Sequence, residues 1–184
     1  MADITLSAKS PLDGLDVTVG ECRLREVQLA LASVAIPLKG ERALAKALKS
    51  HFALGMPDAK LTTVAGFARA ARTGPDQLML LLEDQSAADV QSALSDVAYV
   101  TDQSDNWVQC EISGSGALAA LERICPIDLH DASFPEHAYA RTVMEHMGAA
   151  ILRTGPQTWL LMSASSSAKS FAHAVELSMT YSAG

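Results

Sequence analysis

The chain has 184 residues, of which 49% are hydrophobic and only 5% aromatic. A net charge of -7 and an isoelectric point near 5.1 argue against a nucleic-acid-binding surface, which needs clustered lysine and arginine. No stretch approaches the roughly 18 apolar residues of a membrane span, and the first residues lack the pattern of a secretion signal, so we expect a cytoplasmic protein.

The first part of the chain predicts an arm followed by a strand and a helix. Residues 1–21 mix Ser, Lys, Pro, Asp and Gly with little periodicity, which indicates an extended arm, and order is expected from Cys22. Residues 27–36 predict one or two strands, ended by Pro37. The segment 41–52 predicts an amphipathic helix with its lysines and arginines on the polar face. Its apolar face is formed by Leu44, Ala47, Leu48 and Phe52.

The next segments complete a β-α-β-β-α-β order. Strands are expected at 67–73 and 77–83, on either side of a Gly-Pro turn. Ser86 and Asp89 have the spacing of a capping box at the start of a second helix. A last strand is expected at 99–101, and the whole order is that of a ferredoxin-like unit.

The second part of the chain predicts a similar order with a longer irregular segment. The expected elements are a strand at 107–112, a helix after Gly114 that ends at Cys125-Pro126, an irregular stretch at 127–137, strands near 140–147, 149–153 and 157–163, and a helix from Ser165 to Met179.

A repeated sequence supports two related halves. Arg72-Thr73-Gly74-Pro75 recurs 81 residues later as Arg153-Thr154-Gly155-Pro156, each time between two apolar runs. We therefore predict an α+β fold of two fused ferredoxin-like halves. They form a single duplicated domain over 22–184, divided into about 22–103 and 104–184.

Short serine motifs are weak evidence for acyl-transfer chemistry. Ser166-Ser167-Ala168-Lys169 fits S-x-x-K, Ser104-Asp105-Asn106 fits S-D-N, and the Arg-Thr-Gly triplets resemble K-T-G. In serine acylases, however, the nucleophile motif comes first in the chain, whereas here it comes last. A serine-capped helix and two turns are the favoured interpretation.

Metal and thiol chemistry have little support in the spacing of the candidate ligands. Cys22, Cys110 and Cys125 are too far apart for a disulfide framework or a CxxC zinc motif, so we expect reduced thiols. The gaps between Cys125 and the histidines do not match a compact tetrahedral site. The histidines considered with it are His130, His137 and His146.

Two further patterns favour structural roles. Gly114-Ser115-Gly116 could bind a phosphate at a helix start but lacks a third glycine, so a tight turn with Ser115 as the helix cap is favoured. Asp102, Asp105 and Glu111 lie around a strand connection, as turn-forming acids often do. No catalytic, cofactor-binding or metal-binding residue is therefore predicted.

Several motifs in one order resemble the gamma subunit of heterotetrameric sarcosine oxidase, across essentially the whole chain. The segments that carry the resemblance are Ser10-Pro11-Leu12, Leu24-Arg25-Glu26-Val27, Thr73-Gly74-Pro75, Thr101 to Trp107, Cys125 to His130, Phe134-Pro135, Ala140-Arg141-Thr142 and Arg153 to Pro156.

The resemblance implies a subunit of a bacterial complex that oxidatively demethylates sarcosine, in sarcosine catabolism and one-carbon metabolism. In that family FAD, FMN, NAD, tetrahydrofolate and zinc belong to other subunits, and the gamma chain looks like the folate-binding fold of the glycine-cleavage aminomethyltransferase. That enzyme family has a catalytic aspartate in the segment equivalent to the one after Gly148, where this chain reads Ala-Ala-Ile-Leu-Arg. Alanine or isoleucine cannot replace a proton-handling acid.

We therefore expect a non-catalytic structural subunit whose partners are the alpha, beta and delta subunits. Trp107 and Phe134 are the expected interface anchors, because large aromatic residues dominate such surfaces. Two alternatives stay open: a diverged folate-dependent one-carbon or aminomethyl enzyme, and a stand-alone folate-binding module.

Overall fold

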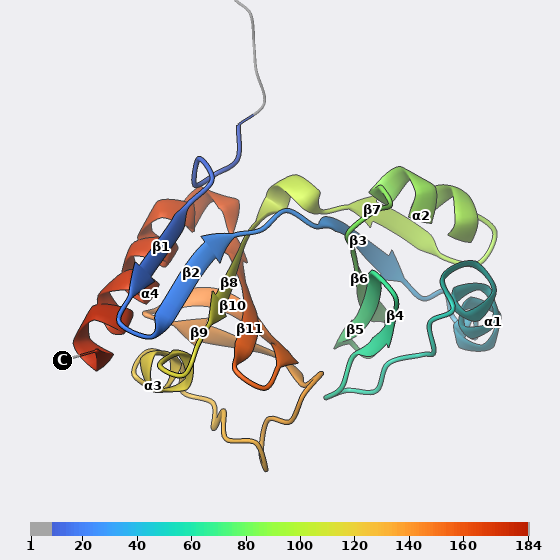
Figure 1. Cartoon of the computed structure of the whole chain (residues 1–184). Coiled ribbons are helices and arrows are strands. Elements are labelled where there is room, and N and C mark those ends of the chain that lie inside the picture. The colour runs from blue at the N-terminus through green and yellow to red at the C-terminus, as the bar shows by residue number, and fades with distance from the viewer. Residues whose placement is uncertain (1–8, 184) are drawn as a thin grey trace, which may run out of the picture.

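The computed structural model describes residues 9–183 and contains two antiparallel sheets that face each other, with helices on their outer sides (Figure 1). The first-half sheet has the order β4-β5-β6-β3-β7, and the second-half sheet has the order β1-β2-β8-β11-β10-β9. Helices α1 (Glu41–Phe52) and α2 (Ala87–Leu94) cover the first-half sheet. Helices α3 (Ala117–Glu122) and α4 (Ala168–Ser182) cover the second-half sheet.

The first half confirms the ferredoxin-like order. Its strands are β3 (Ala30–Ala35), β4 (Thr63–Ala65), β5 (Ala68–Gly74), β6 (Gln77–Leu82) and β7 (Tyr99–Asp102). Leaving out the short edge strand β4, the chain runs β-α-β-β-α-β and the strands lie side by side in the order second, third, first, fourth. All pairs are antiparallel, as this topology requires.

The second half has the same arrangement but takes its last strand from the start of the chain. Its strands are β1 (Asp16–Val19), β2 (Cys22–Glu26), β8 (Trp107–Ser113), β9 (Tyr139–Met144), β10 (Met147–Gly155) and β11 (Thr158–Ala164). After α4 the described chain reaches residue 183 without another strand, and β2 pairs with β8 in the position that β7 has beside β3. The second half is therefore completed by β2.

This pairing corrects two expectations about the beginning of the chain. Residues 16–19 do not belong to an extended arm, because they form β1 and pair with β2. Residues 22–26 do not belong to the first half, because β2 joins the second-half sheet. The part of the expected arm that spans residues 1–8 lies outside the described residues.

The helices follow local sequence signals. Leu44, Leu48 and Phe52 are the buried residues of α1, as its apolar spacing predicts. At α2, Ser86 accepts from the Asp89 backbone N–H, and the Asp89 carboxylate accepts from the Ser86 backbone N–H at 2.8 Å. This is the predicted capping box. The helix expected from Ser165 begins with a 3-10 turn, and α4 starts at Ala168.

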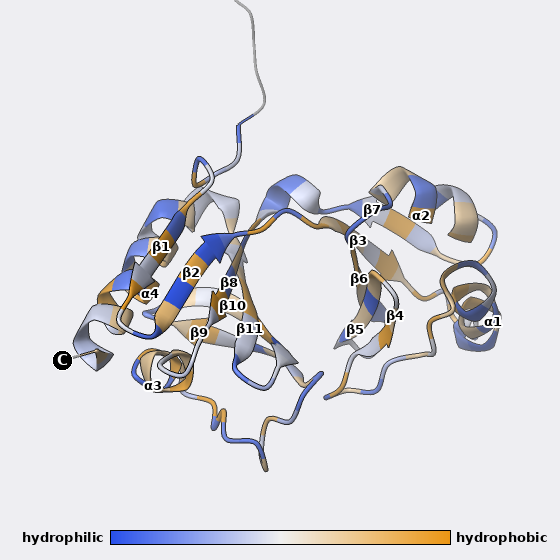
Figure 2. Cartoon of the chain, in the orientation of Figure 1, coloured by the Kyte–Doolittle hydropathy of each residue, from blue (hydrophilic) through white to orange (hydrophobic). Residues whose placement is uncertain are grey.

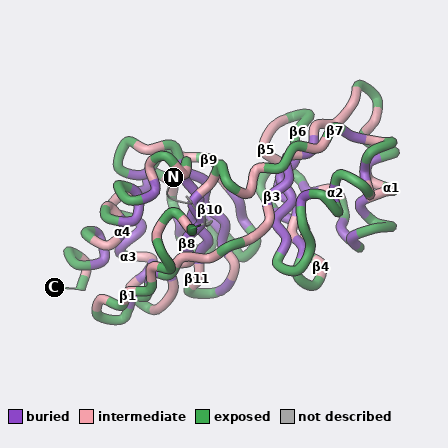
Figure 3. The backbone as a smooth tube through the Cα atoms, turned by 90° about the horizontal axis from the view of Figure 1, so that it is seen from above, coloured by how far each residue is buried: buried purple, intermediate pink, exposed green. Residues whose placement is uncertain are grey.

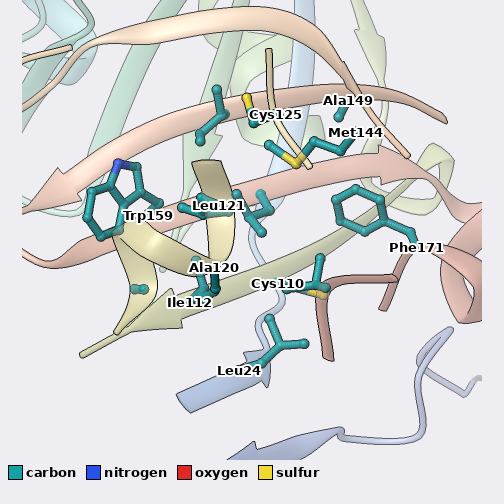
Figure 4. Close-up of a cluster of buried hydrophobic side chains, with 14 of the residues drawn as sticks. Leu24, Cys110, Ile112, Ala120, Leu121, Cys125, Met144, Ala149, Trp159 and Phe171 are labelled. Atoms are coloured by element: carbon teal, nitrogen blue, oxygen red, sulfur yellow. The ribbon is translucent and has the colours of Figure 1, made fainter. Parts of the chain in front are cut away.

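Alternating side chains of the central strands divide the core into three layers. Trp159 and Leu161 of β11 point to the helices of the second half, together with Phe171 of α4 (Figure 4). Leu160 and Met162 of the same strand face the first-half sheet. The purple tube of buried residues in Figure 3 follows the central strands of both halves. The two sheets are therefore joined by an apolar layer of their own.

Among residues 9–183, every helix is too short or too polar to span a membrane.

Candidate functional site

The crossover between the two sheets, residues 27–29, lies between two surface cavities. One cavity, of about 520 Å³, is bounded by the arm, the crossover and the start of β8. The other, of about 470 Å³, is bounded by the crossover, β2 and parts of both sheets. Both cavities lie at the junction of the halves, where a small ligand could bind.

Glu26 fixes the arm against the first cavity. Its carboxylate accepts hydrogen bonds from the Ser10 hydroxyl at 2.7 Å, the Leu12 backbone N–H at 3.1 Å and the Gly14 backbone N–H at 2.7 Å. A carboxylate with three donors is held in one orientation. The arm from Ser10 to Gly14 is therefore a fixed wall of the cavity, and both carboxylate oxygens of Glu26 are bonded within the chain.

Two further polar side chains of the first cavity, Gln109 and Ser104, also bond within the chain. The Gln109 side chain donates to the Leu29 carbonyl at 2.9 Å and accepts from the Leu29 backbone N–H at 3.3 Å. The Ser104 hydroxyl donates to Asp102 at 2.7 Å and accepts from the Leu31 backbone N–H at 3.1 Å. These bonds fix the crossover against the start of the second half.

The same contacts decide the roles of the Ser-Asp-Asn motif and the neighbouring acids. The backbone N–H and the hydroxyl of Ser104 hold the pKa of Asp102 below its ordinary value. Glu111 forms an ion pair with Arg25 at 2.8 Å. Asp102 and Glu111 thus have separate partners, and the acids of this segment do not form a general acid–base pair.

The second cavity is lined by both arginines and glutamates of this chain. Arg69 is half-buried there beside Glu83, and burial lowers the pKa of its guanidinium. One of its nitrogens lies 3.3 Å from the His137 ring. The cavity also contains the Arg25–Glu111 ion pair, so cations and carboxylates are mixed along its wall.

The three cysteines are buried free thiols, as expected. Burial raises the pKa of Cys22 to about 11 and of Cys110 to about 12, and it also raises the pKa of Cys125. A thiol with a raised pKa stays protonated at neutral pH, when it is neither a good nucleophile nor a metal ligand. The cysteines therefore act here as small apolar core residues.

The histidines considered with Cys125 are dispersed. His146 lies in the two-residue turn between β9 and β10, where it and Glu145 both have positive φ. His137 lies at the junction of the halves, and His130 is exposed in the irregular loop. Within residues 9–183, no cluster of three His, Cys, Asp or Glu side chains could hold a metal ion.

The S-x-x-K and glycine motifs have structural surroundings. Ser166 lies in the 3-10 turn before α4, and Lys169 is an exposed residue of that helix. Gly114 has φ 111°, and a Cβ added there would lie 2.0 Å from the Glu21 carbonyl oxygen. The Ser115 hydroxyl donates to the Glu21 carboxylate, so this serine has a partner within the chain. The helix cap expected at Ser115 is wrong, because Gly116 is the N-cap of α3.

The irregular stretch at 127–137 is fixed by Arg153, a residue whose role the sequence did not reveal. Arg153 is 5% exposed and donates to the carbonyls of Phe134 at 3.0 Å, Gly155 at 3.2 Å and Pro156 at 2.6 Å. It also pairs with Asp131 at 2.7 Å. The repeated Arg-Thr-Gly-Pro sequence is the available signal for this residue, but the repeat predicts a turn and two related halves and not the role of the arginine.

The two expected interface anchors differ in exposure. Trp107 is partly buried and lines the first cavity. Phe134 is 5% exposed and belongs to the core of the second half. The ring of Phe134 is therefore not available on the surface of this chain, whereas the role of Trp107 stays a prediction.

The fold defines the class of protein. The structure resembles glycine cleavage system aminomethyltransferase T from Bartonella henselae, with a TM-score of 0.53 over 85% of this chain and 45% of that chain at 14% identity. A chain of heterotetrameric sarcosine oxidase from Corynebacterium sp. U-96, solved with pyrrole 2-carboxylate, matches with a TM-score of 0.83 at 24% identity. That match covers 96% of this chain and 97% of the other. The chain thus has an aminomethyltransferase-like α+β fold.

Sequence similarity identifies the family. The sarcosine oxidase subunit gamma of an Arthrobacter species is 31% identical over 154 residues, which cover 79% of this chain and 73% of the relative. The protein of the same name from Corynebacterium sp. (strain P-1) is 29% identical over 151 residues, with the same shares covered. No protein-family model matches the chain. This chain belongs to the family of sarcosine oxidase gamma subunits.

Proposed function

We propose that this chain works as a structural subunit of a heterotetrameric sarcosine oxidase, assembled with alpha, beta and delta subunits. The observation that carries the proposal is the 31% identity to a sarcosine oxidase subunit gamma over 79% of the chain. The Corynebacterium protein whose chain has the same fold is a heterotetrameric sarcosine oxidase.

A structural role is supported by how the candidate chemical groups are used. Glu26, Asp102 and Glu111 each bind groups of this chain, and the three thiols are buried and protonated. The segment after Gly148 forms the middle of β10, where its alanines, isoleucine and leucine are buried. Each of these groups stabilises the fold.

The cofactors of the reaction belong, in this proposal, to the other subunits. FAD, FMN, NAD and tetrahydrofolate need sites with donors and acceptors directed at the ligand, and zinc needs three or four converging ligands. In the two junction cavities of the described residues, Glu26, Gln109 and the Arg25–Glu111 pair are used within the chain, and the same residues offer no metal-ligand cluster. The contribution of this chain is a fixed surface.

Co-expression tests the proposal. The tagged chain is expressed with the alpha, beta and delta subunits of the same organism, purified by affinity, and examined for stoichiometry, flavin absorbance and sarcosine oxidation. A complex of four chains that carries the flavin and loses assembly or stability when this chain is left out is the expected result. If the other three subunits form a fully active enzyme while this chain elutes alone, the proposal is wrong.

Titration of the isolated chain with tetrahydrofolate separates the structural role from the two folate alternatives. A structural subunit should show no saturable binding. A micromolar dissociation constant for the chain alone would contradict the purely structural role and favour a folate-binding one.

A further inference from the structure

One helix of this acidic protein has a strongly basic surface, which we name the basic α1 face. It consists of exposed Arg42, Lys46 and Lys49, which lie along one side of α1 at helical spacing, and of exposed Lys39, which precedes the helix. These are four of the 14 lysines and arginines of the chain. Helix α1 lies on the outer side of the first half, away from the second-half sheet (Figure 2).

The basic α1 face is not neutralised within the chain. Glu41, the acid of the first turn, is bound by Arg72 from β5 at 2.7 Å. Lys49 bonds to the Ala53 carbonyl at 3.4 Å, which caps the helix end but leaves its charge uncompensated. In residues 9–183, none of the four cations of this face has a carboxylate within ion-pair distance.

The arrangement is unfavourable for an isolated helix. Arg42 and Lys46 are like charges four residues apart, which destabilises a helix. Lys39 and Arg42 lie at the N-terminal end, where the positive pole of the helix dipole opposes cations. The core needs only the apolar residues of the opposite face. In the second half, α3 has no basic residue, and Arg123 just after it lies over the Tyr181 ring.

An exposed aromatic ring lies beside one end of the basic α1 face. Phe67, in the β4–β5 turn, is 63% exposed and borders a cavity of about 290 Å³ that Lys49 also lines. Asp84 is the acid on the rim of that cavity. A ring next to cations supplies the apolar anchor and the charges that protein interfaces combine.

We propose that the basic α1 face, with Phe67 at its end, docks on a carboxylate-rich protein surface of another subunit. This inference rests on the proposed function, because it assumes that the chain assembles with partners. Opposite charges across the contact steer association and fix orientation. They also provide the neutralisation that the chain itself does not supply.

A protein fits this face better than a nucleic acid or a membrane. The net charge of -7 means that the rest of the surface repels polyanions, so an extended phosphate backbone gains little beyond the four cations. An amphipathic helix enters a membrane with its apolar face, but the apolar face of α1 is buried in the core. A local group of carboxylates on a folded partner matches the size of this patch.

The test compares two charge reversals of equal size in the complete complex. Arg42→Glu/Lys46→Glu alters the basic α1 face, and Lys60→Glu/Lys169→Glu reverses two exposed lysines elsewhere. Each chain is co-expressed with the three partner subunits and its recovery in the complex is measured. Circular dichroism and thermal unfolding establish that both variants are folded. A third variant, Arg42→Lys/Lys46→Arg, changes the same two side chains but keeps their positive charges.

The inference predicts at least a tenfold loss of assembly for Arg42→Glu/Lys46→Glu, with wild-type recovery for the other two variants and weaker wild-type assembly at high salt. It is overturned if the α1 reversal assembles like the wild type. Self-association of the chain and its binding to polyuridylate and to phosphatidylserine vesicles are measured as well. The inference is also overturned if the α1 reversal weakens one of these interactions and leaves assembly with the other subunits unchanged. Failure of the wild-type chain itself to assemble would instead contradict the proposed function.

Discussion

Arg72 and Arg153 share two backbone contacts at equivalent places in the two halves of the chain. Each guanidinium donates to the carbonyl of the proline three residues later, at 2.7 Å for Arg72 and 2.6 Å for Arg153. Each also bonds to a carbonyl of the loop that precedes its own hairpin, Pro57 in the first half and Phe134 in the second. The repeated sequence therefore encodes an arginine that ties a hairpin turn to an incoming loop.

Replacing these arginines should have unequal effects. Arg153→Met leaves the buried carbonyls of Phe134 and Gly155 and the part-buried carbonyl of Pro156 without their donor, so we expect a loss of about 3–5 kcal/mol in the free energy of unfolding. The side chain of Arg72 is more exposed, at 17% against 6%, so Arg72→Met should cost only about 1–2 kcal/mol. Urea denaturation of both variants measures the difference, and equal losses would contradict it.

The local parts of this fold could be predicted from sequence. The segment 41–52 has apolar residues at helical spacing, and α1 has those bounds. Ser86 and Asp89 form the predicted capping box. Both signals depend on residues within one or two turns, so no distant contact was needed to interpret them.

The long-range parts could not be predicted. Strand β2 completes the half at the other end of the chain, because its pairing with β8 joins residues about 90 positions apart. The three bonds that Glu26 accepts from the arm, and the burial of Phe134, also depend on tertiary packing. Sequence spacing alone contains no information about these contacts.

Gly114 should tolerate no side chain. Its φ of 111° is unfavourable for other residues, and a Cβ would lie 2.0 Å from the Glu21 carbonyl oxygen. We expect Gly114→Ala to lower the free energy of unfolding by at least about 2 kcal/mol. Gly148→Ala is the control, because a Cβ there meets no atom within 4 Å and should leave stability within about 0.5 kcal/mol of wild type. Similar losses for both would show that the turn is not constrained.

Acid should weaken the irregular loop through Asp128. The Ser133 hydroxyl and the His130 backbone N–H hold the pKa of this carboxyl below its ordinary value. A lowered folded-state pKa contributes stability above the unfolded value, near pH 4, and that stability is lost as the pH falls through the folded value. Asp128→Asn should therefore have a lower Tm than wild type at pH 6, and this difference in Tm should disappear by pH 2. A difference in Tm that does not change with pH would contradict stabilisation of the loop by the ionised Asp128 carboxylate.

The thiols should be protected while the protein is folded. Cys22, Cys110 and Cys125 are 3%, 0% and 6% exposed, and burial raises the pKa of each, so few thiolates exist at pH 8. Iodoacetamide at pH 8 should modify the native chain slowly and add three groups rapidly in urea, as counted by mass spectrometry. Cys110, in the middle of β8, should react last in a partial urea series, because its exposure requires separation of β8 from β11. Rapid modification of native Cys110 would mean that the second-half sheet opens far more readily than its packing implies.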